Sequence, residues 1–430
     1  MLDKTLAMTT LICTIVCGCN MVNEPVPAIA VTSESTTIEA VEILDHYRSL
    51  GKHRSGSHTD KATSVWLQSE LQTRGISADL QEWPLDVFEL VKSSIEASDR
   101  VFETFPFWYP VATGPKGIEA PLAIADGAEE GALTDSIAVF RLPPGQFEVH
   151  YDVAPVLQDA ADKGALAAVI ILDHPIKAVS AQNANRPYHQ QSLPIPALIA
   201  SEVDAEELLT LATNKKSVHL IIDGENQQTR AMNVIGEIDR GADQWVVIST
   251  PISGWFEATN ERGPGIAMWL QLAQWAKHSD LDANFLFTAL SGHELGKMGM
   301  EALVDSGELP VPDSVALWLH LGSGIAVKNP LISAVSSVTS LRKSVQETLT
   351  SNTAMAYWPE DKMPKASEQY RALQLGYPVA GLFGADPNIH TRHDQISRID
   401  DAGYSKIFSA LQELIQRQLA ENPLINEKTQ

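Results

Sequence analysis

The stretch Asn284-Phe-Leu-Phe-Thr-Ala-Leu-Ser-Gly-His-Glu294 indicates the fold of this chain. Its first part, Asn284–Leu290, is almost entirely apolar, as expected of a buried strand, and a glycine turn then leads to His293 and Glu294. Similar apolar runs lie at Trp245–Ser249, Val315–Leu319 and Val379–Phe383, and helical patterns lie at 265–277, 340–351 and 403–420. This alternation predicts an α/β domain with a mostly parallel central sheet flanked by helices.

Polar side chains follow each predicted strand of this sheet, at the edge where ligands bind in open α/β folds. In chain order they are Glu261 and Arg262, then His293 and Glu294, then His320, and finally His390, His393 and Asp394. Carboxylates and imidazoles that converge on one edge are the side chains of metal sites and of acid–base catalysis. We therefore predict the functional site at this edge.

Composition excludes one large class of partners. The chain has 430 residues, and 31 Lys and Arg against 54 Asp and Glu give a formal net charge of −23. A strongly acidic chain is a poor ligand for a phosphate backbone, so we expect no nucleic-acid partner. The length suits two or three domains, each with its own core.

The N-terminus has the pattern of an export signal. Lys4 precedes an apolar run, Leu6–Val16, which is too short for a comfortable membrane span, and Val16-Cys17-Gly18-Cys19 resembles a bacterial lipoprotein signal. This resemblance predicts a signal over residues 1–19, lipidation of Cys19, and a tether over residues 20–36. The expected location is the cell envelope, facing the periplasm or the exterior, with attachment to the membrane only through the lipid; a cleaved secretory signal is the alternative.

Residues 118–225 read as a separate small α/β unit. Short strands alternate with helices there, and the segments Lys163–Ile171 and Leu193–Ala200 resemble the protease-associated domain, a non-catalytic insert of several peptidase families. We therefore predict that residues 37–117 and 226–430 are the two parts of one main domain, and that residues 118–225 are inserted between them.

The order of several motifs resembles the zinc aminopeptidase family, which also contains the glutaminyl cyclases. The motifs are Glu261-Arg-Gly-Pro-Gly265, Phe287–Gly296 and Ile389-His-Thr-Arg-His-Asp394, and the resemblance covers about residues 40–420. It implies a zinc-exopeptidase-like fold and assigns metal-ligand positions to Glu261, Glu294 and His390.

Other positions of the family pattern differ in this chain. The resemblance places Thr250 at one ligand position, His320 at another, and His293 at the position of the general-base glutamate. It therefore implies one zinc ion rather than two, with His293 and His320 as candidate acid–base groups.

Further residues are candidates for supporting roles. Arg262 would either pair with Glu261, which would lower metal affinity, or bind a substrate carboxylate. Trp255, Tyr357 and His393 are candidate substrate contacts, and Asp394 is a candidate hydrogen-bond partner of His390 or His393.

Three functions fit these observations. The first is a one-metal hydrolase of small peptides or amides, in which His293 handles the proton. The second is a lyase or cyclase that uses His293 and His320 as acid and base. The third is a non-catalytic lipoprotein that binds a small peptide or another small molecule.

Overall fold

The computed structural model describes residues 33–98, 100–142, 153–184, 193–327, 333–336, 338–350, 356–358, 367–384, 386–395 and 399–421. The predicted signal, the predicted tether up to residue 32 and Cys19 lie outside this part of the chain. None of the helices described is both long and apolar enough to cross a membrane.

The central sheet contains the four predicted strands. They are β9 (Trp245–Pro251), β10 (Asn284–Leu290), β11 (Val315–Leu321) and β14 (Val379–Phe383), which run parallel in the order β14-β11-β9-β10. Antiparallel neighbours flank them, because β8 (Ser217–Ile238) pairs with β10 and β12 (Ser333–Ser336) pairs with β14. Beyond β12 lies β13 (Ala356–Trp358). The predicted α/β class and mostly parallel central sheet are confirmed.

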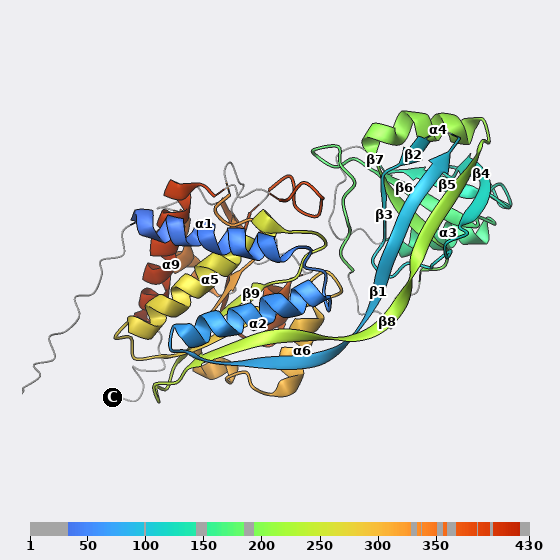
Figure 1. Cartoon of the computed structure of the whole chain (residues 1–430). Helices are drawn as coiled ribbons and strands as arrows, with labels where there is room; N and C mark the ends of the chain where they lie inside the picture. Colours follow the sequence, from blue (N-terminus) through green and yellow to red (C-terminus); the bar gives the residue numbers. More distant parts are fainter. Residues whose placement is uncertain are drawn as a thin grey trace, which may run out of the picture. The chain divides into compact units, whose positions relative to one another are not determined.

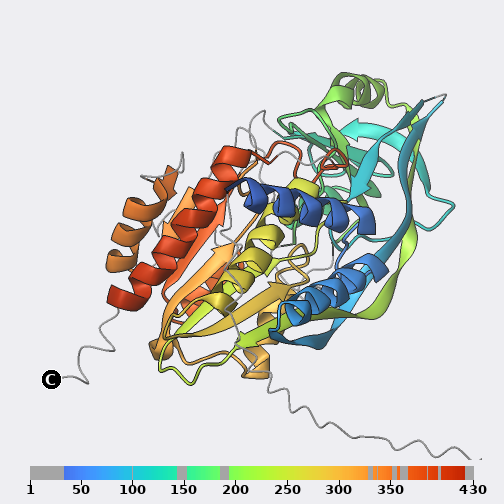
Figure 2. The ribbon, with the colours of Figure 1, turned by 60° about the vertical axis from the view of Figure 1, so that its left-hand side comes forward.

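Helices cover both faces of this sheet. On one face lie α1 (Ser33–Leu50), α2 (His58–Thr73), α5 (Thr259–His278), α7 (Thr339–Val345), which continues as a π-helix at Gln346–Thr350, and α9 (Asp401–Glu421). Figure 2 shows α1, α5 and α9 side by side across the strands. On the other face lie α6 (Met298–Ser306) and α8 (Glu368–Gln374). Alternate residues of β9, such as Val246 and Val247, enter the two opposite cores, as expected of strands buried on both sides.

A long two-stranded ribbon connects the central sheet with the other strands. β1 (Ser77–Ala97) pairs with β8 along almost its whole length, and the two strands run together in Figure 1. The ribbon continues into β4 (Ile118–Ile124), β5 (Ile137–Arg141), β6 (Ala167–Leu172) and β7 (Ala197–Ser201), which are parallel to one another. The shorter elements there are β2 (Arg100–Phe102), β3 (Thr104–Pro106), α3 (Ala154–Asp162) and α4 (Ala205–Thr213).

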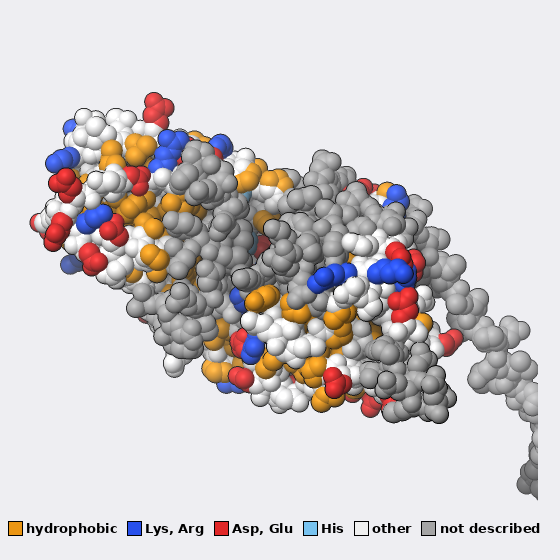
Figure 3. Space-filling view, turned by 180° about the vertical axis from the view of Figure 1, so that it is seen from behind, with side chains coloured by type: hydrophobic (Ala, Val, Ile, Leu, Met, Phe, Trp, Pro, Cys, Tyr) orange, Lys and Arg blue, Asp and Glu red, His pale blue; other side chains and the backbone are white. Residues whose placement is uncertain are grey.

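The residues predicted as an insert form strands and helices, and their buried core also includes Phe88, Ile95, Ala97 and Phe102, which precede them in the chain. The predicted boundary after residue 225 falls inside β8, a single strand that pairs with β10 near one end and with β4 near the other. The kinship of this unit with the protease-associated domain stays a prediction. On the face shown in Figure 3, acidic and basic side chains are interspersed over the described residues.

Candidate functional site

The predicted site residues are carried by the carboxyl ends of the central strands. Glu294 follows β10, His390 follows β14, and Glu261 lies in the first turn of α5. This helix begins at Thr259, earlier than the predicted residue 265, because the Asp394 carboxylate accepts hydrogen bonds from the backbone N–H groups of Asn260 (2.8 Å) and Glu261 (3.0 Å).

Four side chains meet in what we call the Arg262 cluster: Glu261, Arg262, Glu294 and His390. Arg262 Nη2 lies 2.9 Å from Glu261 Oε1 and also 2.9 Å from Glu294 Oε1. The side chains of Arg262 and of both glutamates are at most 2% exposed. Of the two roles that the sequence left open for Arg262, the structure has the pairing with Glu261, and it adds Glu294 as a second partner.

Further hydrogen bonds surround Arg262. Glu294 Oε2 accepts hydrogen bonds from Ser253 Oγ (2.7 Å) and Ser55 Oγ (3.1 Å), and Arg262 Nε donates to the Ser253 carbonyl (2.7 Å). Burial raises the pKa of Glu261, but the charges of Arg262 and His390 outweigh burial and lower it to about 2. Both carboxylates are therefore held by cations and hydroxyl groups.

The His390 ring faces an acceptor on each side. Its Nε2 lies 3.1 Å from Glu261 Oε1, and its Nδ1 lies 3.1 Å from the backbone oxygen of Ala181. Burial lowers the pKa of His390, but the Glu261 carboxylate outweighs burial, so the pKa is raised above its ordinary value. A ring that donates from both nitrogens carries a proton where a metal ligand needs a lone pair.

A segment from the predicted insert lies against the Arg262 cluster. The Ala181 N–H donates to the His390 carbonyl and the Ala184 N–H donates to the Glu294 carbonyl, each at 2.8 Å. Between them, Asn183 Oδ1 accepts a 2.7 Å hydrogen bond from Trp255 Nε1. The segment therefore fixes the backbone of two predicted metal ligands. Residues 181 and 183 had given no signal in the sequence, because this contact joins distant parts of the chain.

A second cluster, the Glu368 cluster, adjoins the first through the neighbouring residues His293 and Glu294. His293 Nδ1 lies 2.7 Å from Glu368 Oε1, and His320 Nε2 lies 3.7 Å from Glu368 Oε2. His320 Nε2 and Glu368 Oε2 are buried and have no hydrogen-bond partner among the described residues. His320 Nδ1 contacts Ser249 Oγ at 2.9 Å, and burial lowers the pKa of His320 to about 4, so the ring is neutral at pH 7.

Glu368 was not predicted. It is the first residue of α8, which has little apolar periodicity, so the sequence gave no reason to select it. His293 and His320, the predicted acid–base pair, share this carboxylate. His293 is partly exposed, whereas His320 is almost fully buried.

The other predicted residues are spread around these clusters. Trp255 is buried beside the segment 181–184, and His393 is exposed. Asp394 binds the first turn of α5 rather than either histidine ring, which differs from the prediction, because the amides of that turn need an acceptor. Thr250 donates to the Leu321 carbonyl. The side chain of Tyr357 lies outside what the structure describes.

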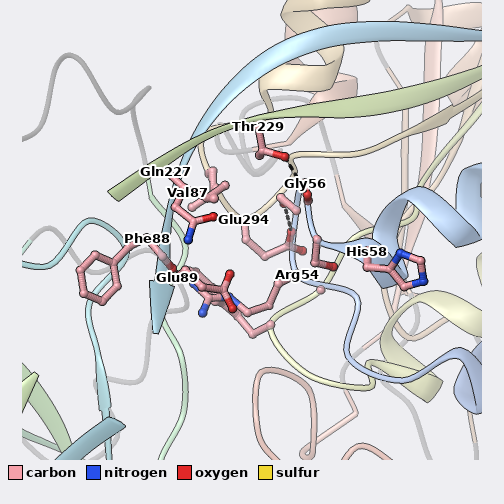
Figure 4. Close-up of a pocket in the computed structure, with 14 residues that line it drawn as sticks. Arg54, Gly56, His58, Val87, Phe88, Glu89, Gln227, Thr229 and Glu294 are labelled. Atoms are coloured by element: carbon pink, nitrogen blue, oxygen red, sulfur yellow. Dashed lines mark hydrogen bonds between the residues drawn. The ribbon is translucent and has the colours of Figure 1, made fainter. Parts of the chain in front are cut away.

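A pocket of about 170 Å³ lies beside Glu294 (Figure 4). The loop before α2 contributes Arg54 and Gly56 to its wall, and Thr229 of β8 lies next to Gly56, donating a 3.2 Å hydrogen bond to the Gly56 carbonyl. The Arg54 guanidinium donates to the Phe88 carbonyl (3.2 Å) and lies 5.4 Å from the centre of the Trp255 ring. The pocket is therefore lined by a cation that packs over an aromatic ring.

The residues present do not fit a zinc ion. No group of three or more His, Cys, Asp or Glu in the described part of the chain is arranged to hold a metal. The two carboxylates share the Arg262 guanidinium, and both His390 nitrogens face acceptors. A divalent cation placed among these groups would face the permanent charge of Arg262 at close range.

No protein-family model matches the chain, and no curated protein matches it in sequence. Solved structures do match it. The zinc aminopeptidase of Bacillus subtilis aligns with a TM-score of 0.72 at 14% identity, covering 91% of this chain and 96% of that chain. A peptidase M28 precursor from Shewanella amazonensis gives 0.69 at 19% identity, covering 90% and 97%. An aminopeptidase from Aneurinibacillus sp. strain AM-1 gives 0.68 at 15% identity, covering 90% and 94%. The chain therefore has the fold of the zinc aminopeptidases, as the sequence motifs predict.

Proposed function

We propose that this chain is a lipoprotein of the cell envelope that binds a small peptide-like ligand on an aminopeptidase scaffold, without zinc-dependent hydrolysis. The observation that carries the proposal is the position of the Arg262 guanidinium between the carboxylates of Glu261 and Glu294. A metallopeptidase needs a metal with an open coordination position to activate water and polarise a carbonyl. Here an arginine side chain that is almost fully buried holds both carboxylates, and it has no exposed surface to offer a substrate.

The pocket beside Glu294 is the proposed ligand site. Arg54 offers a positive charge to a ligand carboxylate, and its guanidinium packs over the buried Trp255 ring. Glu89, which also lines the pocket, supplies an acceptor for a ligand amine. A short peptide carries both kinds of charge, which is why we choose this ligand class.

A second candidate function rests on the Glu368 cluster. A partly exposed His293 that is oriented by a buried carboxylate has the arrangement of a general base. This arrangement favours a metal-independent proton-transfer reaction, such as the lyase or cyclase step that the sequence left open. It ranks second because the buried Arg262 guanidinium is committed to the two glutamates rather than to an oxyanion.

The test uses the purified mature chain and a panel of dipeptides and aminoacyl p-nitroanilides, with either zinc or a chelator present. We expect calorimetry to detect binding of some dipeptides, and we expect no hydrolysis in either condition. Arg54→Gln should weaken binding about tenfold or more, as expected for loss of a charge-assisted hydrogen bond. Lys52→Gln, an exposed change in the same loop, is the matched control.

Chelator-sensitive hydrolysis by wild type would overturn the proposal. Turnover that survives the chelator and is lost in His293→Ala would select the second candidate. Absence of both binding and turnover across the panel would reject a peptide ligand.

A further inference from the structure

We infer that Arg262 is an internal substitute for a metal ion, and that Glu261, Glu294 and His390 form a latent zinc site that opens when this one side chain is shortened. The inference shares with the proposed function the position of Arg262. It goes further, because it states what the surrounding residues do once the guanidinium is gone.

The first argument is geometric. Arg262 Nη2 is within 2.9 Å of one oxygen from each glutamate, and His390 Nε2 lies 3.1 Å from the same Glu261 oxygen. The guanidinium therefore lies where the donor atoms of three side chains converge. Two carboxylates and one imidazole are ligand types that zinc accepts, and they leave a coordination position for water.

The second argument concerns charge. Two carboxylates in a dry interior require compensating positive charge, because an unpaired buried ion is costly. Arg262 supplies one positive charge that does not depend on pH in any ordinary range. Its removal leaves the carboxylates without that compensating charge. A divalent cation is small enough to occupy the vacated space and supplies positive charge again.

The third argument is that other residues already orient the three donors. The Ala181 carbonyl faces His390 Nδ1, the hydroxyl groups of Ser55 and Ser253 contact Glu294 Oε2, and Asp394 holds the α5 turn that carries Glu261. Such outer contacts fix the direction of metal ligands and raise affinity. These contacts are made by groups other than the Arg262 guanidinium, although its Nε also donates to the Ser253 carbonyl, so we expect them to persist when the side chain is shortened.

The experiment compares full-length Arg262→Asn with wild type, each produced with and without added zinc. Zinc is measured by elemental analysis and titrated by calorimetry, and thermal unfolding is followed in both conditions. We expect about one zinc ion per Arg262→Asn chain, bound at least tenfold more tightly than by wild type, and a zinc-dependent rise of several degrees in its unfolding midpoint.

Two controls separate the latent site from a general effect. Arg240→Asn removes another half-buried guanidinium, but one that donates to the carbonyls of Ser279 and Leu281 rather than to carboxylates, so zinc should not stabilise this variant. The double variant Arg262→Asn with Glu294→Gln lacks one donor and should lose the gain in zinc affinity.

Each outcome decides. If neither wild type nor Arg262→Asn binds zinc, the inference fails and the proposed function stands. If wild type binds zinc stoichiometrically, both fail. Arg262→Ala is made as a second variant. If both Arg262→Asn and Arg262→Ala are insoluble even in zinc-supplemented cells, the inference also fails, because bound zinc would restore the charge balance of the buried carboxylates and with it the fold.

Discussion

His293 Nδ1 lies 2.7 Å from Oε1 of Glu368, a residue that enters the site from a helix on the opposite side of the sheet from α5. Burial raises the pKa of Glu368, but His293, followed by His320, outweighs burial, so its pKa lies below the ordinary value of 4.5. The carboxylate is therefore charged at neutral pH and fixes the orientation of the His293 ring. This pair orients the His293 ring on the partly exposed side of the candidate site.

Glu368→Gln should lower the free energy of unfolding at pH 7 by about 1.5–3 kcal/mol, the range for hydrogen bonds to charged groups. A carboxyl whose pKa is lowered by folding contributes stability above about 4.5, and this contribution is lost as the pH falls below that value. The gap between wild type and variant should therefore shrink in acid. Urea unfolding at pH 7 and pH 4 measures this difference in unfolding free energy, with the exposed Glu82→Gln as control. A difference that is larger at pH 4 than at pH 7 would contradict a lowered pKa for Glu368.

Arg262→Met should be among the most destabilising single changes in this chain under zinc-free conditions. It leaves Glu261 and Glu294 buried without their shared cation, and breaking a buried ion pair from one side costs about 3–5 kcal/mol. Arg230→Met removes the exposed partner of Glu82 and should cost less than about 1 kcal/mol. Guanidinium chloride titrations of the two variants give the comparison, and near-equal midpoints would show that the buried pair contributes little.

Cys19→Ser should release the chain from the membrane fraction of bacterial cells. A lipid on Cys19 is the only membrane attachment that the sequence predicts, and a single hydroxyl substitution removes the acceptor thiol. Cell fractionation measures release from the membrane, and metabolic labelling with a fatty acid measures loss of the lipid. Cys13→Ser is the matched change and should leave labelling intact; equal labelling of the two variants would exclude Cys19 as the anchor.

The sequence predicted the central strands and the edge at which the site forms. Apolar runs are sufficient for this, because parallel strands place their carboxyl ends together and the residues after them must converge. Glu261, Glu294 and His390 do lie within one network of contacts. Their metal-binding role came from the family resemblance alone, and it stays untested.

What the sequence could not supply depends on contacts between distant segments. Arg262 lies in α5, and its burial against Glu294 at the end of β10 decides that it pairs internally rather than facing a ligand. No local pattern encodes this contact. Glu368 and Ala181 reach the site from helix and loop positions without periodicity. Residues 77–115 alternate like strands in the sequence, but the pairing of β1 with β8 joins distant segments and no local pattern encodes it.

Asp60→Asn should change how stability depends on pH. Burial raises the pKa of Asp60 from 3.8 to about 7, against the lowering effect of its hydrogen bonds from Ser291 Oγ (2.6 Å) and the Gly56 N–H (2.7 Å). Since the folded chain holds this proton more tightly than the unfolded chain, Asp60 makes the fold less stable as the pH rises from about 4 to about 7. The loss is on the order of a few kcal/mol.

An asparagine oxygen keeps both hydrogen bonds without the charge. The stability of Asp60→Asn relative to wild type should therefore increase as the pH rises across this range, whereas that of the exposed Asp79→Asn should not. Urea unfolding at pH 5 and pH 8 measures the difference, and parallel pH profiles for wild type and Asp60→Asn would mean that Asp60 ionises in the fold as it does in water.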